Sequence, residues 1–99
     1  MQEKEFQKLV EDKCREHKVH FWHVTTKDPG MKGFPDLCIV GTHKLIFREL
    51  KRSTFERPAG EQARLLHKLR GAGQDAGVWT PADLADGTID PELDSLNRS

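Results

Sequence analysis

The chain has 99 residues, of which 35% are hydrophobic and 32% charged, and this fits one small domain with a modest core. It has no run of eighteen apolar residues and no apolar N-terminal stretch, so we expect neither a transmembrane helix nor a secretory signal. Both cysteines fall on helix-like or strand-like segments, and we expect buried thiols in a reducing, cytoplasmic setting.

The formal net charge is zero, but the charges are unevenly distributed along the chain. Residues 75–99 carry six acids against Arg98 alone, whereas residues 43–70 carry three Glu against eight basic residues: Lys44, Arg48, Lys51, Arg52, Arg57, Arg64, Lys68 and Arg70. A basic middle allows a local phosphate-binding surface on a neutral protein. Solvated faces of a helix and a hairpin are the alternative interpretation.

The first half of the chain predicts one helix and three strands. Residues 3–16 carry apolar side chains at helical spacing, and residues 19–24 are rich in β-branched and aromatic types that favour a strand. Residues 25–33 contain Asp-Pro-Gly and predict a loop. Residues 37–40 and 45–51 predict a hairpin whose strands are central in a sheet and covered on both faces.

The second half predicts a helix over 60–70 and a strand over 76–79, joined to the hairpin by a parallel crossover. Thr80 then caps a short helix with Pro81 at its first position. The class is therefore α/β, with the order αβββαβ. Residues 87–99 show no clear period, and we expect a domain over 1–86 followed by a partly disordered tail.

The most informative residues lie at the open end of the hairpin. If Thr42 and His43 form its tip, residue 36 pairs with residue 49, and Asp36, Glu49 and Lys51 share one face. Two neighbouring carboxylates repel unless a cation lies between them, and hard oxygen ligands suit Mg²⁺ or Mn²⁺. A surface salt bridge across the hairpin is the alternative.

A longer set of short motifs carries a family resemblance. In chain order these are Glu3-Lys4-Glu5-Phe6-Gln7, Trp22-His23, Gly33-Phe34-Pro35-Asp36-Leu37, Phe47-Arg48-Glu49-Leu50-Lys51, Glu61-Gln62, Val78-Trp79 and Pro81-Ala82-Asp83-Leu84. Over about residues 3–85 the chain resembles the VRR-NUC domain, a branch of the PD-(D/E)XK nuclease superfamily. The resemblance implies a restriction-endonuclease-like core with a mixed four-stranded sheet flanked by helices.

The resemblance also implies roles for individual residues. Asp36, Glu49 and the backbone carbonyl of Leu50 would bind the metal, and Lys51 would hold or activate the attacking water. Gln62 would orient Lys51 or touch a phosphate. The family uses a glutamate on the first helix, and a helical wheel places Glu3, not Glu5, inside the apolar arc. As residues that contact nucleic acid we expect Lys27, Lys32, Arg52, Arg57 and Arg64.

The implied function is a metal-dependent DNA endonuclease that hydrolyses phosphodiester bonds. Stand-alone phage members and Holliday junction resolvases with the same core suggest a homodimer that cuts branched DNA in phage replication, recombination or repair, in the host cytoplasm. A non-catalytic module that binds nucleic acid or a replication or packaging partner is the alternative. A third interpretation, a structural protein whose acidic tail binds a partner, is supported by no sequence motif.

Overall fold

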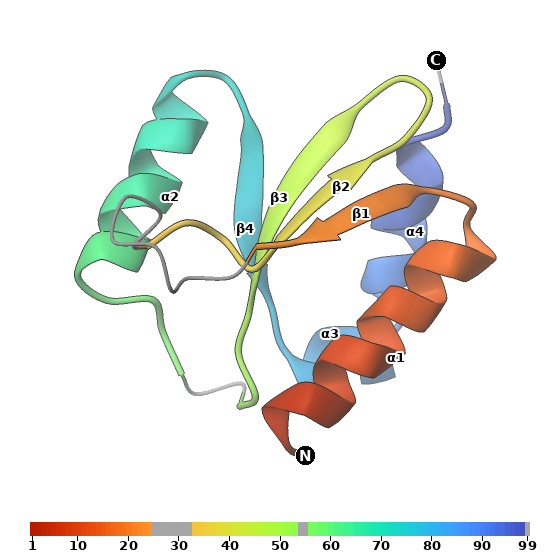
Figure 1. The fold of residues 1–99 in the computed structure, drawn as a ribbon, viewed down its shortest axis with the longest axis horizontal. Helices are drawn as coiled ribbons and strands as arrows, with labels where there is room; N and C mark the ends of the chain where they lie inside the picture. Colours follow the sequence, from red (N-terminus) through yellow and green to blue (C-terminus); the bar gives the residue numbers. More distant parts are fainter. Residues whose placement is uncertain (25–32, 54–55, 99) are drawn as a thin grey trace.

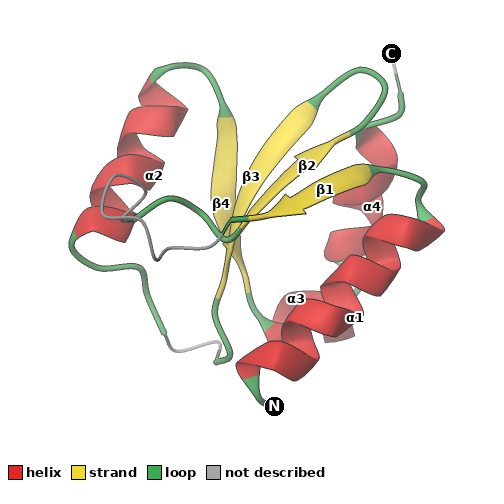
Figure 2. Ribbon diagram, viewed as in Figure 1, coloured by secondary structure: helices red, strands yellow, loops and turns green. Residues whose placement is uncertain are grey.

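The computed structural model describes residues 1–24, 33–53 and 56–98. Within these ranges one four-stranded sheet is flanked by helices (Figure 1). The elements are α1 (Glu3–Glu16), β1 (His20–His23), β2 (Leu37–Val40), β3 (Leu45–Leu50), α2 (Glu61–Gly71), β4 (Asp75–Trp79), α3 (Pro81–Ala85) and α4 (Ile89–Ser95) (Figure 2). The α/β class and the order αβββαβ are confirmed. No helix in the described part of the chain has the length and apolar character needed to cross a lipid bilayer.

Local sequence explains the bounds of these elements. The apolar stripe of α1 buries Phe6, Val10 and Cys14, as its helical spacing predicts. A capping box starts α3, where the Asp83 carboxylate accepts a 2.7 Å hydrogen bond from the Thr80 amide and Pro81 takes a first-turn position. Neither cysteine is in a disulfide, and burial raises the pKa of the Cys14 thiol to about 12.

The sheet has the order β1-β2-β3-β4 and is mixed. Strands β1, β2 and β3 are antiparallel neighbours, whereas β3 and β4 run parallel with α2 between them in the chain. In the hairpin, Val40 pairs with Leu45 and Cys38 with Phe47, and the Gly41 amide closes the turn on the Lys44 carbonyl at 2.8 Å. The predicted register of the hairpin is therefore confirmed.

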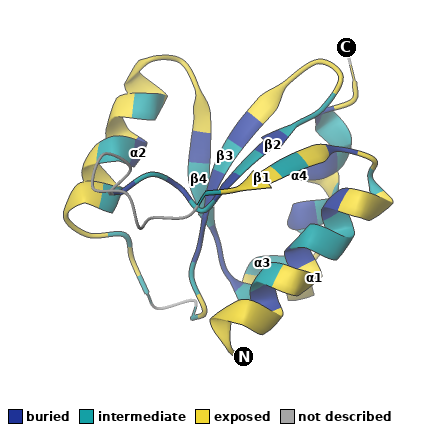
Figure 3. Ribbon diagram, in the orientation of Figure 1, coloured by how far each residue is buried: buried dark blue, intermediate teal, exposed yellow. Residues whose placement is uncertain are grey.

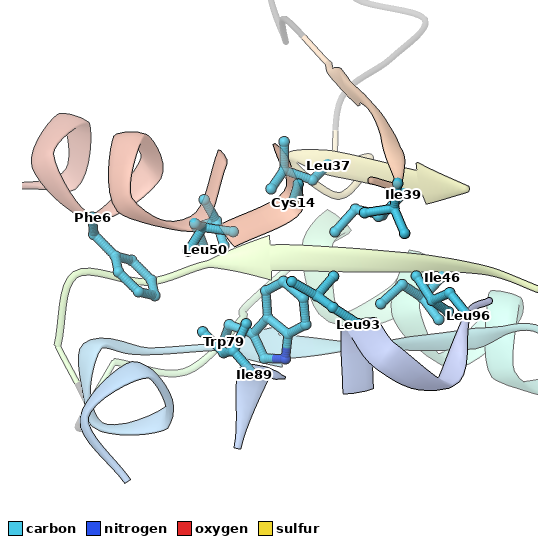
Figure 4. Packing of buried hydrophobic residues seen from close by; sticks show 12 residues of the cluster. Phe6, Cys14, Leu37, Ile39, Ile46, Leu50, Trp79, Ile89, Leu93 and Leu96 are labelled. Atoms are coloured by element: carbon cyan, nitrogen blue, oxygen red, sulfur yellow. The ribbon is translucent and has the colours of Figure 1, made fainter. Parts of the chain in front are cut away.

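The two faces of the sheet are covered unequally. One face carries Leu37, Ile39, Ile46 and Leu50, each at most 2% exposed, and packs against α1 and α4 (Figure 4). The other face is covered by α2 on the β4 side, and its central residues Cys38, Val40 and Phe47 are only partly buried. The expectation that both faces are fully covered holds for the first face alone.

The C-terminal segment departs most from expectation. The prediction of a partly disordered tail is wrong for residues 89–96, because Ile89, Leu93 and Leu96 are at most 1% exposed and belong to the main core (Figures 3 and 4). Gly41 allows this packing, since a Cβ there would lie 2.4 Å from the Leu96 Cβ. The packed core therefore continues past residue 86.

An ion cluster around the buried Arg48 fastens α4 to the sheet. Arg48 is 6% exposed, and its guanidinium contacts Glu92 Oε1 at 2.6 Å and Asp75 Oδ1 at 2.9 Å. The Trp79 indole N–H donates to the same Glu92 oxygen at 3.2 Å, and the Arg48 guanidinium lies 5.3 Å from the indole ring centroid. Arg48 is thus used inside the protein and does not contribute to the basic surface predicted for residues 43–70.

Replacing Leu93 with Ala should destabilise the whole domain by about 2–5 kcal/mol, because it leaves a cavity between α4 and the sheet. The measurement is urea unfolding followed by circular dichroism. Leu9→Ala on α1 is the matched control, since Leu9 is 39% exposed and should cost far less. Equal losses from the two variants would show that α4 is not part of the cooperative unit.

Candidate metal centre

The backbone places Asp36, Glu49 and Lys51 together at the open end of the hairpin. Asp36 directly precedes β2, Glu49 lies near the end of β3, and Lys51 follows that strand. The Asp36 carbonyl accepts a 2.7 Å hydrogen bond from the Val24 amide, and the Lys51 amide donates to the Trp79 carbonyl at 3.0 Å. Both flanks of the site are therefore held by sheet-like hydrogen bonds beyond the strand ends.

Asp36 is fixed by the strand opposite. Its Oδ2 atom accepts a 2.8 Å hydrogen bond from the Leu50 amide, so the carboxylate is drawn across the hairpin toward β3. This contact brings the Asp36 carboxylate to the residue next to Glu49. The contact with the Leu50 amide could not be predicted from the sequence, because backbone donors carry no residue-specific pattern.

Glu49 is a buried acid with an unsatisfied oxygen. It is 1% exposed, and its Oε2 atom has no hydrogen-bond partner among the described residues. Burial, then a side-chain hydrogen bond with Asp36 and repulsion from its charge, raises the pKa of Glu49 to about 9, and the Lys51 charge opposes this rise. Without a cation, burial and the neighbouring Asp36 therefore favour the protonated form of Glu49.

Lys51 is tied to α2. Its ammonium donates a 2.7 Å hydrogen bond to Gln62 Oε1, one residue after the start of that helix. This contact orients the Lys51 amine on the face of the sheet that carries Glu49. The predicted proximity of Gln62 and Lys51 is thus observed, whereas their chemical roles stay predictions.

The first helix contributes one charge to the site. Glu3 is among the groups whose charge raises the Glu49 pKa, and Glu5 is not. Both glutamates are exposed at the start of α1. Within residues 1–24, 33–53 and 56–98, no three His, Cys, Asp or Glu side chains come close enough to hold one ion, so Glu3 does not complete a three-carboxylate set here.

The remaining donors fit a hard, water-rich cation such as Mg²⁺ or Mn²⁺. The unpartnered Oε2 atom of Glu49 is buried and belongs to a carboxyl group that lies next to the carboxyl group of Asp36. This oxygen would gain a partner if a cation replaced the proton. Mg²⁺ is commonly bound through one or two carboxylates and keeps several water or phosphate ligands. Asp36 and Glu49 would hold such an ion, and the Leu50 carbonyl remains a predicted third ligand.

The expected DNA-contacting residues that the structure describes have different partners. Arg52 contacts Glu56 at 3.1 Å and Arg64 contacts Glu61 at 2.9 Å, and all three basic residues that can be described, Arg52, Arg57 and Arg64, are exposed. Such surface ion pairs are weak, so a phosphate can replace the carboxylate partner. Lys27 and Lys32 lie outside the described residues.

Gly33 permits a close contact between the loop before β2 and the start of α2. Its φ is +85°, and a Cβ there would lie 2.7 Å from the Glu61 carbonyl carbon and oxygen. These are backbone atoms of the residue next to Gln62, so they cannot move aside without shifting α2. Only glycine therefore keeps Gln62 in its place beside Lys51.

Gly33→Ala should destabilise the domain by about 2–4 kcal/mol, from the left-handed backbone and the clash with α2 together. Gly73→Ala is the matched control: Gly73 also has φ +85°, but nothing lies within 4 Å of its Cβ position. Thermal unfolding of the two variants measures the difference. Equal destabilisation would mean that the contact with Glu61 contributes nothing.

Similarity to known proteins is found at the level of the fold. No family model and no curated protein matches the sequence. A solved structure described as a VRR_NUC domain protein superposes with a TM-score of 0.70 at 21% identity, over 98% of this chain and 91% of that chain. The chain therefore has the fold of a VRR-NUC domain, as the sequence resemblance implies, with the mixed four-stranded sheet flanked by helices.

Proposed function

We propose that this protein is a metal-dependent DNA endonuclease. The observation that carries the proposal is the buried Glu49 next to Asp36, with an unpartnered oxygen and with Lys51 beside it. A buried acid whose pKa is strongly raised is costly to a fold and is typical of functional sites. The shared fold with a VRR_NUC domain protein supports nuclease chemistry for this pair.

The residues suit hydrolysis of a phosphodiester. This reaction needs a nucleophile at neutral pH and positive charge against the phosphate. A bound Mg²⁺ or Mn²⁺ would supply that charge and lower the pKa of a water molecule. Asp36 and Glu49 would hold the ion, and Glu49 would give up its proton on binding it.

Lys51 provides the second positive group. Its ammonium faces the same site as Glu49 and is positioned by Gln62 Oε1. In the charged form Lys51 stabilises the negative charge that develops on the scissile phosphate. In the neutral form it takes a proton from the attacking water as a general base. A pH–rate profile of Lys51→Arg separates the two roles, since arginine keeps the charge but cannot act as a base at neutral pH.

We further propose branched DNA as the substrate and a homodimer as the active form, acting in phage replication, recombination or repair in the host cytoplasm. A domain of this size gains a larger DNA footprint most simply through a symmetric dimer. Two sites on one symmetric body suit paired cuts at a junction. This part of the proposal is supported by analogy with junction resolvases that share the core.

The test is a panel of labelled four-way junction, flap, nicked and linear duplex DNA, each incubated with Mg²⁺, Mn²⁺ or EDTA. We expect ion-dependent cleavage, fastest on branched DNA. Equal rates on junction and linear duplex would contradict the substrate assignment. Absence of cleavage on every substrate with both ions would contradict the nuclease assignment and favour a non-catalytic DNA-binding module.

A further inference from the structure

Beside the metal centre, a cavity of about 350 Å³ lies between α2, β4 and the segment before α2. It is lined by Arg57, Pro58, Ala63, Leu66, Arg70 and Val78. Leu66 and Val78 are its most sheltered apolar residues, whereas Arg57, Ala63 and Arg70 are exposed at its rim. Figure 1 shows α2 alongside β4. Its volume falls in the range of small-ligand sites.

The charge of the cavity selects an anionic ligand. Both charged residues in its described lining are arginines, and no Asp or Glu is among them. Arg70 is held by a 2.7 Å hydrogen bond from its Nε to the Ala76 carbonyl, which leaves its two Nη groups as donors within the described part of the chain. A larger cavity beside α4, about 460 Å³, is lined by Asp90 and Asp94 as well as His17 and Arg98. The two acids pair with His17 and Arg98, so this cavity offers a phosphate no net positive charge.

The cavity lies on the same face of the sheet as the metal centre. Val78 is the register partner of Glu49 in the parallel β3–β4 pair. Gln62, Leu66 and Arg70 follow each other at four-residue intervals on α2 and so share one helix face. Arg70 lies about 12 Å along the helix axis from Gln62, or roughly three to four nucleotides along a DNA strand.

Apolar surface and guanidinium groups together suit a ligand that has both an anionic group and an apolar face. Duplex DNA offers phosphates at its surface but keeps its bases stacked inside. An unpaired nucleotide presents a phosphate and an exposed base face, and bases pack on apolar side chains and arginine planes in protein pockets. The apolar floor of the cavity would have no partner if only a phosphate bound at the rim.

We propose that this cavity is a subsite for an unpaired nucleotide of the DNA, a few nucleotides from the scissile phosphate. The proposal rests on the nuclease function proposed above and deepens it. Arg57 and Arg70 bind the phosphate, and the base packs against Ala63, Leu66 and Val78. Flapped, bulged or gapped DNA supplies such a nucleotide, whereas a continuous duplex does not.

The test compares three short fluorescein-labelled duplexes by anisotropy, without divalent ions so that no cleavage occurs. One is fully paired, one carries a single-nucleotide bulge, and one carries an abasic bulge with the same phosphates but no base. We expect the wild-type protein to bind the base-bearing bulge roughly tenfold more tightly than the abasic bulge. Equal affinity for the two bulges would overturn the proposal.

Two test variants, each with a matched control, show whether the preference for the base-bearing bulge comes from the cavity. Ala63→Phe fills the cavity from an exposed helix position and should abolish the preference for the base, whereas His67→Phe adds the same group outside the lining and should retain it. Arg70→Gln should weaken binding of both bulges more than Lys68→Gln does, since Lys68 is exposed on α2 but absent from the lining. A preference that survives Ala63→Phe would place the base elsewhere and overturn the proposal.

This measurement is independent of catalysis. Loss of the base preference with intact Mg²⁺-dependent cleavage would remove the subsite and leave the nuclease assignment standing. A preference for the base-bearing bulge in a protein that cleaves no DNA would support the subsite and contradict the nuclease assignment. Thermal unfolding of each variant checks that the fold is retained.

Discussion

Replacing Lys51 with Met is expected to reduce Mg²⁺-dependent DNA cleavage by about 10³-fold or more while the domain stays folded. The variant removes the positive charge and the only lysine amine that contacts Gln62 in the described residues. Loss of one preorganised electrostatic group at a transition state typically costs two to three orders of magnitude, that is ~10²–10³, and a lost general base adds to this. Single-turnover cleavage of a labelled junction gives the rate.

Asp36→Asn should have an effect of similar size for a different reason. Asparagine keeps an oxygen that can accept the hydrogen bond from the Leu50 amide, but it lacks the charge that would hold a divalent ion. Isothermal titration with Mn²⁺ should therefore lose its signal in Asp36→Asn and retain it in Lys51→Met. Lys44→Met at the exposed hairpin tip is the control for a lost lysine charge. Full activity in both site variants would refute the assigned site.

The stability of the metal-free protein should fall as the pH rises. The pKa of Glu49 is raised from 4.5 to about 9 in the folded state, so the folded protein keeps a proton that the unfolded chain releases above about pH 4.5. Between these values the unfolded state binds fewer protons, and the free energy of unfolding decreases by up to about 1.4 kcal/mol per pH unit. We expect a loss of about 1–4 kcal/mol between pH 5 and pH 8, measured by urea unfolding in EDTA.

Glu49→Gln should remove this pH dependence, because glutamine stays neutral in the buried position. At pH 8 the variant should be more stable than the wild type without metal, and Mg²⁺ should stabilise the wild type alone. Glu5→Gln, an exposed acid on α1, is the control and should leave the pH curve unchanged. Parallel pH curves for wild type and Glu49→Gln would mean that Glu49 is not held protonated.

The hairpin could be predicted from the sequence because its pairing is determined by residues close together in the chain. A turn at Thr42 and His43 fixes every pair in the hairpin, and the observed pairs Val40–Leu45 and Cys38–Phe47 follow from it. The approach of Asp36 to Glu49 is a consequence of the same register. Gln62 could be placed near Lys51 only through the family resemblance, since eleven residues and a loop separate the two.

Three features could not be predicted because their causes are distant in the chain. Ile89, Leu93 and Leu96 do have helical spacing, but α4 spans seven residues, and a helix of that length is stable only when it packs on a core. In the sequence Arg48 cannot be distinguished from a surface cation, because its partners Asp75 and Glu92 lie far away along the chain and meet it only in the folded protein. The cavity lined by Arg70 and Val78 likewise depends on how α2 lies on β4.

The Arg48 cluster has a consequence for how loss-of-function variants are interpreted. Arg48 and Glu49 are consecutive on β3, so the same short stretch of backbone carries an anchor on one face and the metal-binding acid on the other. A substitution at Glu92 or Asp75 would remove an ion pair of Arg48 and so weaken the packing of this part of β3, on the face opposite Glu49. A genetic screen for inactive protein would therefore recover changes at both positions alongside true active-site changes, and only a parallel measurement of folding would tell the two groups apart.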